Sequence, residues 1–149
     1  MLLFVALVFF GCGQDGQEPS GKSYNIYYLN NTETAVFSTE YVTRTTDQGE
    51  LLQELLGQLG KVSERLEYKP PLTENVPLLG YTVTQDQLVL SFDESYRQQE
   101  PTTEVLTRAA IVRTLTQIEG IQYVSFQVRS ETLTDVYGSV IGMMNADMF

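Results

Sequence analysis

The side chains of this 149-residue sequence that could support acid–base chemistry are carboxylates, because the chain contains no histidine. Asp93 and Glu94 follow an alternating apolar stretch, and Glu100 and Glu104 stand at the start of a helical pattern. Two carboxylates about 5 to 9 Å apart could hydrolyse a glycoside. Acidic side chains are also expected at strand ends and helix N-termini, where they complement turns and the helix dipole. We therefore predict that these four carboxylates are structural, that no residue is catalytic and that the protein is not an enzyme.

The composition narrows the chemistry further. With no histidine and a single cysteine, the chain cannot form an imidazole-dependent triad or zinc site, or an internal disulfide. Its acidic residues lack the spacing of a calcium loop. We therefore expect no metal, no cofactor and no small-molecule substrate. A formal net charge of −10 repels phosphate backbones, so we also expect no nucleic-acid partner.

The single cysteine, Cys12, lies behind a glycine and the ten-residue apolar run MLLFVALVFF. Ten residues span about 15 Å as a helix, half of a bilayer core of about 30 Å, so the run fits the apolar region of a secretion signal. The sequence FFGC resembles a bacterial lipobox, whose cysteine is acylated, with palmitate among the usual chains, and becomes the mature N-terminus. Cys12 is thus the predicted lipidation site. A cleaved secretion signal with an incidental cysteine, or a short buried helix, are the alternatives.

Behind this cysteine, the sequence GQDGQEPSGK has no apolar side chain and is typical of a flexible tether. The chain is accordingly predicted to contain a signal peptide of the lipoprotein type at residues 1–11, a tether at 12–22 and a folded domain at 23–149. This organisation predicts a protein held on the extracytoplasmic face of the cell membrane by its lipid anchor.

The folded part opens with two alternating stretches. SYNIYYLN places Tyr24, Ile26 and Tyr28 on one face, and AVFSTEYV returns over residues 35–42 as the second strand of a hairpin. NNTET lies between them and is interpreted as the hairpin turn, although its first three residues also match a glycosylation sequon.

The remaining patterns complete the order β-β-α-β-β-α-β. They are a helix over about 48–61 capped by Asp47, two strands around a turn at Gln85-Asp86, a helix from Thr102 or Thr103 to about Ile118 that Gly120 ends, and a strand in IQYVSFQVRS. Residues 130–149 are apolar in patches and are expected to pack as a terminal segment or irregular arm. The order predicts an α+β fold, a single small domain whose mostly antiparallel sheet carries two helices on one face.

The strand in IQYVSFQVRS alternates apolar and polar side chains, so one of its faces is expected to be exposed to solvent. The residues on that polar face, which form the candidate interaction surface for a protein partner, are Tyr123, Ser125, Gln127 and Arg129. The alternative is an ordinary solvated face.

Nine tyrosines are many for a chain of this length, and sugars stack on aromatic rings. Tyr24, Tyr28 and Tyr41 fall on sheet faces, where packing explains them. Tyr27, Tyr96 and Tyr123 are the better surface candidates. A module that binds cell-wall glycan or peptidoglycan is therefore the second functional hypothesis.

The ordered segments IYYLN, a leucine-rich helix, LVLSFDESY and EVLTRAAIVRTLTQIEGIQYVSFQV together resemble the GerMN domain, found in bacterial spore-germination and sporulation lipoproteins. The most specific segment is AAIVRTLTQIEGIQYVSFQV. The resemblance covers about Tyr24 to Val128. It implies a compact α+β domain related in shape to ring-building modules, with a non-enzymatic scaffold or adaptor role in envelope assemblies and with envelope proteins as partners. Some members of the family carry two copies of the domain, whereas no internal repeat is visible in this sequence.

Overall fold

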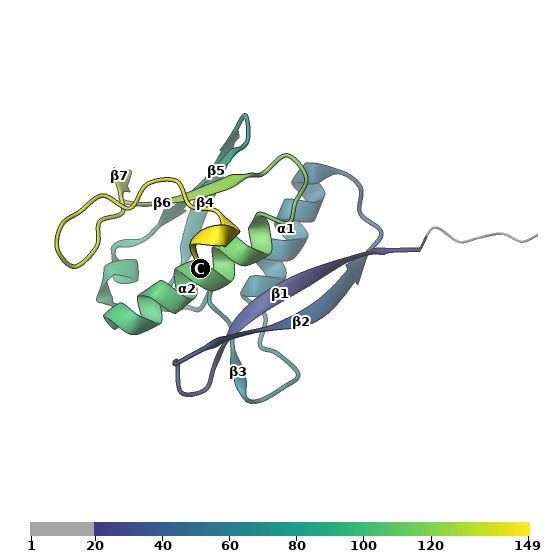
Figure 1. The fold of residues 1–149 in the computed structure, drawn as a ribbon, viewed down its shortest axis with the longest axis horizontal. Coiled ribbons are helices and arrows are strands. Elements are labelled where there is room, and N and C mark those ends of the chain that lie inside the picture. Colours follow the sequence, from purple (N-terminus) through teal and green to yellow (C-terminus); the bar gives the residue numbers. More distant parts are fainter. Residues whose placement is uncertain (1–19) are drawn as a thin grey trace, which may run out of the picture.

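The strands form two sheets, with two long helices packed against them, in the computed structural model, which describes residues 20–149 (Figure 1). The first sheet has the order β2-β1-β3, and its strands are β1 (Lys22–Asn30), β2 (Val36–Thr43) and β3 (Tyr68–Lys69). The second has the order β4-β5-β6-β7, with β4 (Leu78–Thr84), β5 (Gln87–Phe92), β6 (Tyr123–Val128) and β7 (Glu131–Thr132). The predicted fold class, a single small α+β domain, is confirmed, with the strands divided between two sheets.

The first hairpin forms where the sequence predicts it. β1 and β2 pair antiparallel over their lengths, and Tyr24, Ile26 and Tyr28 are buried. The Asn30 side chain organises the turn, since its carbonyl oxygen accepts from the backbone N–H groups of Thr34 and Ala35 at 2.8 and 3.1 Å. Turn chemistry therefore accounts for the asparagine at this position.

Helix α1 (Gln48–Leu59) has the predicted cap and core face. The Asp47 carboxylate accepts from the Glu50 backbone N–H at 2.9 Å, which satisfies an otherwise unpaired donor of the first turn. Gly60 follows the last helical residue. The buried residues of the helix are Leu51, Leu52, Leu55, Leu56 and Leu59.

Helix α2 (Pro101–Leu115) starts earlier than predicted and has a different cap. Glu100 occupies the capping position without a side-chain hydrogen bond, so the prediction of a Thr102 or Thr103 cap is wrong. Proline is favoured at the first helical position because its fixed φ suits the helix and its missing N–H costs nothing there. The chain leaves the helix through a turn in which Gly120 has φ +87°, a conformation that glycine adopts without strain.

Two strands of the second sheet contribute to an aromatic cluster. β4 and β5 are antiparallel, whereas β5 and β6 are parallel and are connected by the short 3-10 helix η1 (Glu94–Gln98) and α2. Phe92 at the end of β5 has its ring centroid 4.7 Å from that of Tyr96 and 5.1 Å from that of Phe126 on β6. Tyr96 is fully buried, so its prediction as a surface tyrosine is wrong.

The C-terminal segment, residues 133–149, lies along the second edge of β6. The Leu133 N–H donates to the Phe126 carbonyl at 3.0 Å, and Val124 and Met144 exchange two backbone hydrogen bonds of 2.8 Å each. The segment ends in a single 3-10 turn, η2 (Ala146–Met148). It therefore extends the second sheet, which its sequence did not reveal.

One continuous hydrophobic core joins the two sheets. Its members run from Tyr24 to Met144, and α2 contacts both β1 of the first sheet and β6 of the second. Residues 20–149 thus contain a hydrophobic core of their own, as a domain that folds independently requires. None of the helices described here has the length and apolar character required to cross a bilayer.

Candidate functional site

The edge of β1 that faces away from β2 is closed by side chains of α2 and of the turn that follows it. β3 pairs with β1 only at Leu29 and Asn30. Further along, the Asn25 N–H donates to Gln117 Oε1 at 2.9 Å, and Gln117 Nε2 donates to the Asn25 carbonyl at 2.7 Å. The Tyr27 N–H donates to Thr114 Oγ1 at 3.1 Å. This edge is therefore not open to a partner strand. Among the described residues the edge strands are β2 and the two-residue β3 in the first sheet, and β4 and the two-residue β7 in the second.

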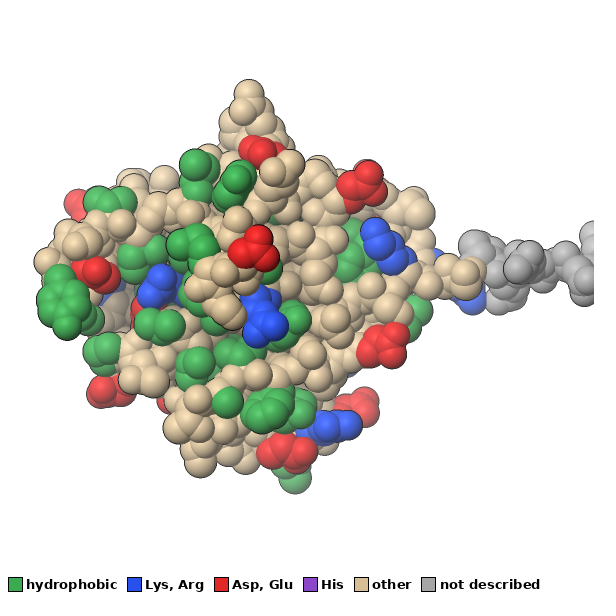
Figure 2. All heavy atoms as spheres, in the orientation of Figure 1, with side chains coloured by type: hydrophobic (Ala, Val, Ile, Leu, Met, Phe, Trp, Pro, Cys, Tyr) green, Lys and Arg blue, Asp and Glu red, His purple; other side chains and the backbone are tan. Residues whose placement is uncertain are grey.

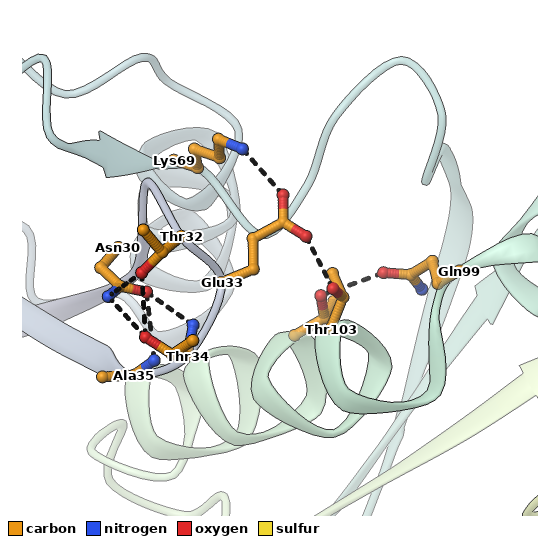
Figure 3. Close-up of polar contacts among 9 residues, drawn as sticks. Asn30, Thr32, Glu33, Thr34, Ala35, Lys69, Gln99 and Thr103 are labelled. Carbon is orange, nitrogen blue, oxygen red and sulfur yellow. Dashed lines mark hydrogen bonds and ion pairs between the residues drawn. The ribbon is translucent and has the colours of Figure 1, made fainter.

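A polar cluster ties the first hairpin to β3 and α2 (Figure 3). Glu33 stands in the β1–β2 turn with φ +53°. Its carboxylate accepts from Lys69 Nζ at 2.9 Å and from Thr103 Oγ1 at 2.6 Å. The hydrogen bond from Thr103, followed by that from Lys69, lowers the pKa of Glu33 below its ordinary value. The contacts of Glu33 with Lys69 and Thr103 therefore link the β1–β2 turn to β3 and α2, and we call them the Glu33 latch.

The candidate carboxylates after β5 make structural contacts. Asp93 caps η1 by accepting from the Ser95 backbone N–H at 3.0 Å, and this hydrogen bond is the main reason that the pKa of Asp93 is lowered. Glu94 lies 3.8 Å from Arg97 Nε and 3.6 Å from Arg129 Nε. These interactions agree with the capping and charge-pairing roles expected from turn chemistry.

The carboxylates on α2 differ in environment. Glu100 is exposed at the start of the helix, whereas Glu104 accepts from Tyr96 Oη at 2.8 Å and from Arg108 Nε at 2.6 Å. Burial and the neighbouring Glu104 carboxylate raise the pKa of Tyr96 well above its ordinary value, so the phenol stays protonated and donates. Arg108 in turn balances the Glu104 charge, which makes this a structural hydrogen-bonded group at the edge of the aromatic cluster.

The predicted interaction surface on β6 is only partly exposed. Ser125 is 8% exposed because it is a short side chain in a central strand, and Gln87 Nε2 donates to its hydroxyl at 3.0 Å. Tyr123 and Gln127 are half-buried. Arg129 is exposed but lies beyond the strand, in the two-residue β6–β7 turn, with φ +51°. The expectation of a solvated face through all four residues is therefore wrong at Ser125.

Sequence reasoning placed some aromatic residues correctly and missed others. Tyr24 and Tyr28 are buried as predicted, and Tyr27 is half-buried with the Arg113 guanidinium 4.4 Å from its ring centroid. Phe37 is 47% exposed and stacks on the half-buried Tyr68 with ring centroids 5.7 Å apart. Phe37 follows the alternation of β2, but nothing in the sequence showed that no helix covers it.

Cys12, the predicted lipidation site, lies outside the described residues. Within residues 20–149, no group of three or more potential ligands among His, Cys, Asp and Glu is placed to hold a metal ion.

These features define a class of protein. It is a small α+β domain in which the polar clusters described above hold secondary-structure elements together. The family model of Germane, described as "Sporulation and spore germination", matches residues 25–134. The chain therefore belongs to the Germane family. No curated protein matches the chain.

Solved structures show the same fold. The first GerMN domain of the sporulation protein GerM from Bacillus subtilis superposes with a TM-score of 0.65 at 12% identity, covering 86% of this chain and 99% of that one. The tandem GerMN domains of the same protein give a TM-score of 0.62 at 12% identity, covering 86% of this chain and 47% of the tandem. A Clostridium perfringens protein described as a candidate lipoprotein gives 0.52 at 19% identity, covering 82% of this chain and 87% of its own.

Proposed function

We propose that this protein is a lipid-anchored adaptor on the extracytoplasmic face of the cell membrane that supports sporulation- or germination-related protein assemblies without catalysis. The observation that carries the proposal is the order of features along the chain. An apolar run and Cys12 come first, a polar tether follows, and a domain of the sporulation and spore-germination family completes the sequence.

The anchor gives such a domain its physical advantage. Acyl chains contribute about 0.8 kcal/mol per buried methylene, so two or three chains on one cysteine hold a protein at the membrane stably. A tethered domain then meets membrane-bound neighbours at a high effective concentration, and weak contacts suffice for assembly. The envelope proteins that it would bring together are the proposed partners.

The contacts of the acidic side chains support a role without catalysis. Asp93 caps a 3-10 helix, Glu94 pairs with two arginines, and Glu104 is shared between Tyr96 and Arg108. Each of these carboxylates has a structural task, which favours binding over bond cleavage as the function of the domain.

The proposal is tested by extracting the full chain and its Cys12→Ala variant from bacterial membranes with mild detergent. The wild-type chain is expected in the membrane fraction and to co-purify with envelope proteins, and the variant is expected to lose both properties. Recovery of both chains in the same fraction, with the same co-purifying proteins, would contradict an anchor at Cys12.

A cell-wall glycan module is the competing function, and the Phe37–Tyr68 pair favours it, because sugars stack on exposed aromatic rings. Purified cell wall should then retain the wild-type protein and release a Phe37→Ala variant. The adaptor proposal predicts equally weak retention of both.

A further inference from the structure

A small hydrogen-bonded hairpin projects from the C-terminal segment at residues 133–141. The Ile141 N–H donates to the Leu133 carbonyl at 2.8 Å, and the Asp135 N–H donates to the Ser139 carbonyl at 2.9 Å. Inside the turn, Asp135 Oδ1 accepts from the Tyr137 and Ser139 N–H groups at 2.9 and 2.8 Å. Gly138 completes the turn with φ +81°. These bonds fix the backbone of the tip before any partner arrives.

The fixed tip presents large apolar side chains to water. Tyr137 is 90% exposed, and Val136 and Val140 are exposed beside it. A groove of about 410 Å³ runs between this hairpin and the first turns of α2, with Pro101 and Val105 on its far wall. A projecting aromatic residue on a hydrogen-bonded turn, next to an apolar groove, is the arrangement expected of an interface hot spot, because little backbone entropy remains to be lost on binding.

The hairpin lies far from the point at which the chain enters the domain. In Figure 1 the chain enters the domain before β1 at one end of the long axis, and the yellow loop after β7 lies at the opposite end. Figure 2 shows hydrophobic side chains gathered at that same end. A tether attached at the N-terminal side therefore joins the domain at the end opposite the hairpin. The family match ends at Thr134, within the first strand of the hairpin.

The charges around the hairpin indicate the chemistry of the partner. The carboxylates near the groove and its rim outnumber the guanidinium groups, and these residues are Glu94, Glu100, Glu104, Glu131 and Asp135 against Arg97, Arg108 and Arg129. Each of these arginines already pairs with a carboxylate, so the rim is net acidic. A second copy would bring the same acidic rim against itself, and an anionic lipid surface would be repelled.

We propose that the hairpin at residues 133–141 and its groove dock a partner protein through an apolar helix face bordered by basic residues. That helix face packs against Tyr137, Val136 and the groove, and its basic border meets the acidic rim. The inference rests on the proposed adaptor function and identifies the surface through which it acts.

The test uses the domain at residues 20–149 and a designed helical peptide with a leucine stripe flanked by lysines, which supplies the chemistry of the expected helix face. A second peptide carries glutamates in place of the lysines. Amide shifts in NMR spectra locate the binding surface and give the affinity. The variant is Val136→Ser with Tyr137→Ser, which leaves Asp135 in place, and the matched control is Val62→Ser with Leu66→Ser, because both residues are exposed and apolar but distant from the hairpin in sequence.

We expect the lysine peptide to shift amides of residues 133–141 and of the first turns of α2. The hairpin variant should bind about tenfold more weakly, as loss of an anchor residue does, with the control unchanged. Binding should weaken with added salt, and the glutamate peptide should bind at least as weakly as the variant.

Equal loss in the control, equal binding of the glutamate peptide, or shifts elsewhere would overturn the proposal. So would self-association in sedimentation, or binding to neutral vesicles, that the hairpin variant abolishes. Because residues 20–149 lack Cys12, failure here leaves the anchor intact, whereas failure of the membrane-extraction test counts against the anchor alone.

Discussion

The two sheets of this domain are built from different kinds of contact. The first grows from a hairpin whose strands are joined by a five-residue turn, with Asn30 holding the turn together. The second depends on a parallel pair, β5 and β6, separated by a helix, and on a C-terminal segment that returns to β6. Local turn chemistry specifies the first hairpin and the β4–β5 hairpin of the second sheet. The parallel pairing of β5 with β6 joins segments far apart in the sequence and depends on burial.

This difference has a consequence for how each sheet can be damaged. The second sheet contributes Phe92 and Phe126 to an aromatic cluster with Tyr96, so its stability depends mainly on apolar packing. The first sheet relies in addition on long-range polar contacts, those of Thr114 and Gln117 with β1 and those of Glu33 with α2. Substitutions at these positions should therefore differ in size and in character.

The largest effect is expected in the aromatic cluster. Replacing Phe126 by Ala removes a fully buried ring and leaves a cavity, at a cost of about 3–5 kcal/mol in the free energy of unfolding. The same change at Phe37, half-exposed in the first sheet, should cost about 0.5–1.5 kcal/mol through loss of its stacking on Tyr68. Chemical denaturation measures both. Equal losses would show that the aromatic cluster is not the main source of stability.

A smaller effect is expected where α2 closes the edge of β1. Thr114→Val keeps the shape of a buried side chain but removes the acceptor for the Tyr27 N–H, at a cost of about 1–2 kcal/mol. Hydrogen exchange of the Tyr27 amide should accelerate, while the Tyr28 amide, whose residue pairs with Phe37 of β2, serves as the internal control. An unchanged Tyr27 amide would mean that the helix does not protect this edge.

The Glu33 latch should give a still smaller, pH-dependent effect. Because its pKa is lowered in the folded state, the ionised carboxylate stabilises the fold above its unfolded value of 4.5, and this contribution is lost as the pH falls through the folded pKa. Glu33→Gln should therefore cost about 0.5–1 kcal/mol near neutral pH and nothing in acid. Denaturation of both chains over a pH series measures the difference, and a constant difference would refute the latch.

The smallest expected effect is a gain at the β6–β7 turn. Arg129 and Ser130 both have positive φ, at +51° and +66°, where a side chain crowds the backbone. Ser130→Gly should therefore raise the free energy of unfolding by about 0.5 kcal/mol, with Ser130→Ala as the variant that keeps the penalty. A gain of equal size for Ala would point to a cause other than the backbone.

The sequence revealed elements better than their pairing. Alternation in LVLSF identified β5 and its buried face, and Asp47 marked the start of α1, because these signals are local. The pairing of Met144 with Val124 left no trace in the sequence, since it consists of backbone hydrogen bonds. Ser125 was predicted to be solvated because it is a polar residue at an alternating position. Alternation does not show which neighbouring segment will cover such a residue.

The candidate surfaces show the same limit. Arg129 continued the alternation of β6 in sequence, but the chain turns there, and the predicted face is shorter than expected. The exposed Tyr137 lies in a segment that was predicted only as a terminal segment or irregular arm. Asp135 and Gly138 are typical turn residues and were the signal that could have indicated a tight loop. Turn chemistry can thus reveal an exposed hairpin tip even where no regular element is predicted.

The most direct test of the adaptor account is the intact mass of the protein extracted from the membranes of the bacterium that makes it. The account predicts a chain that begins at Cys12, lacks residues 1–11 and carries acyl chains on the cysteine. A chain that retains those residues, or an unmodified thiol at Cys12, would contradict it.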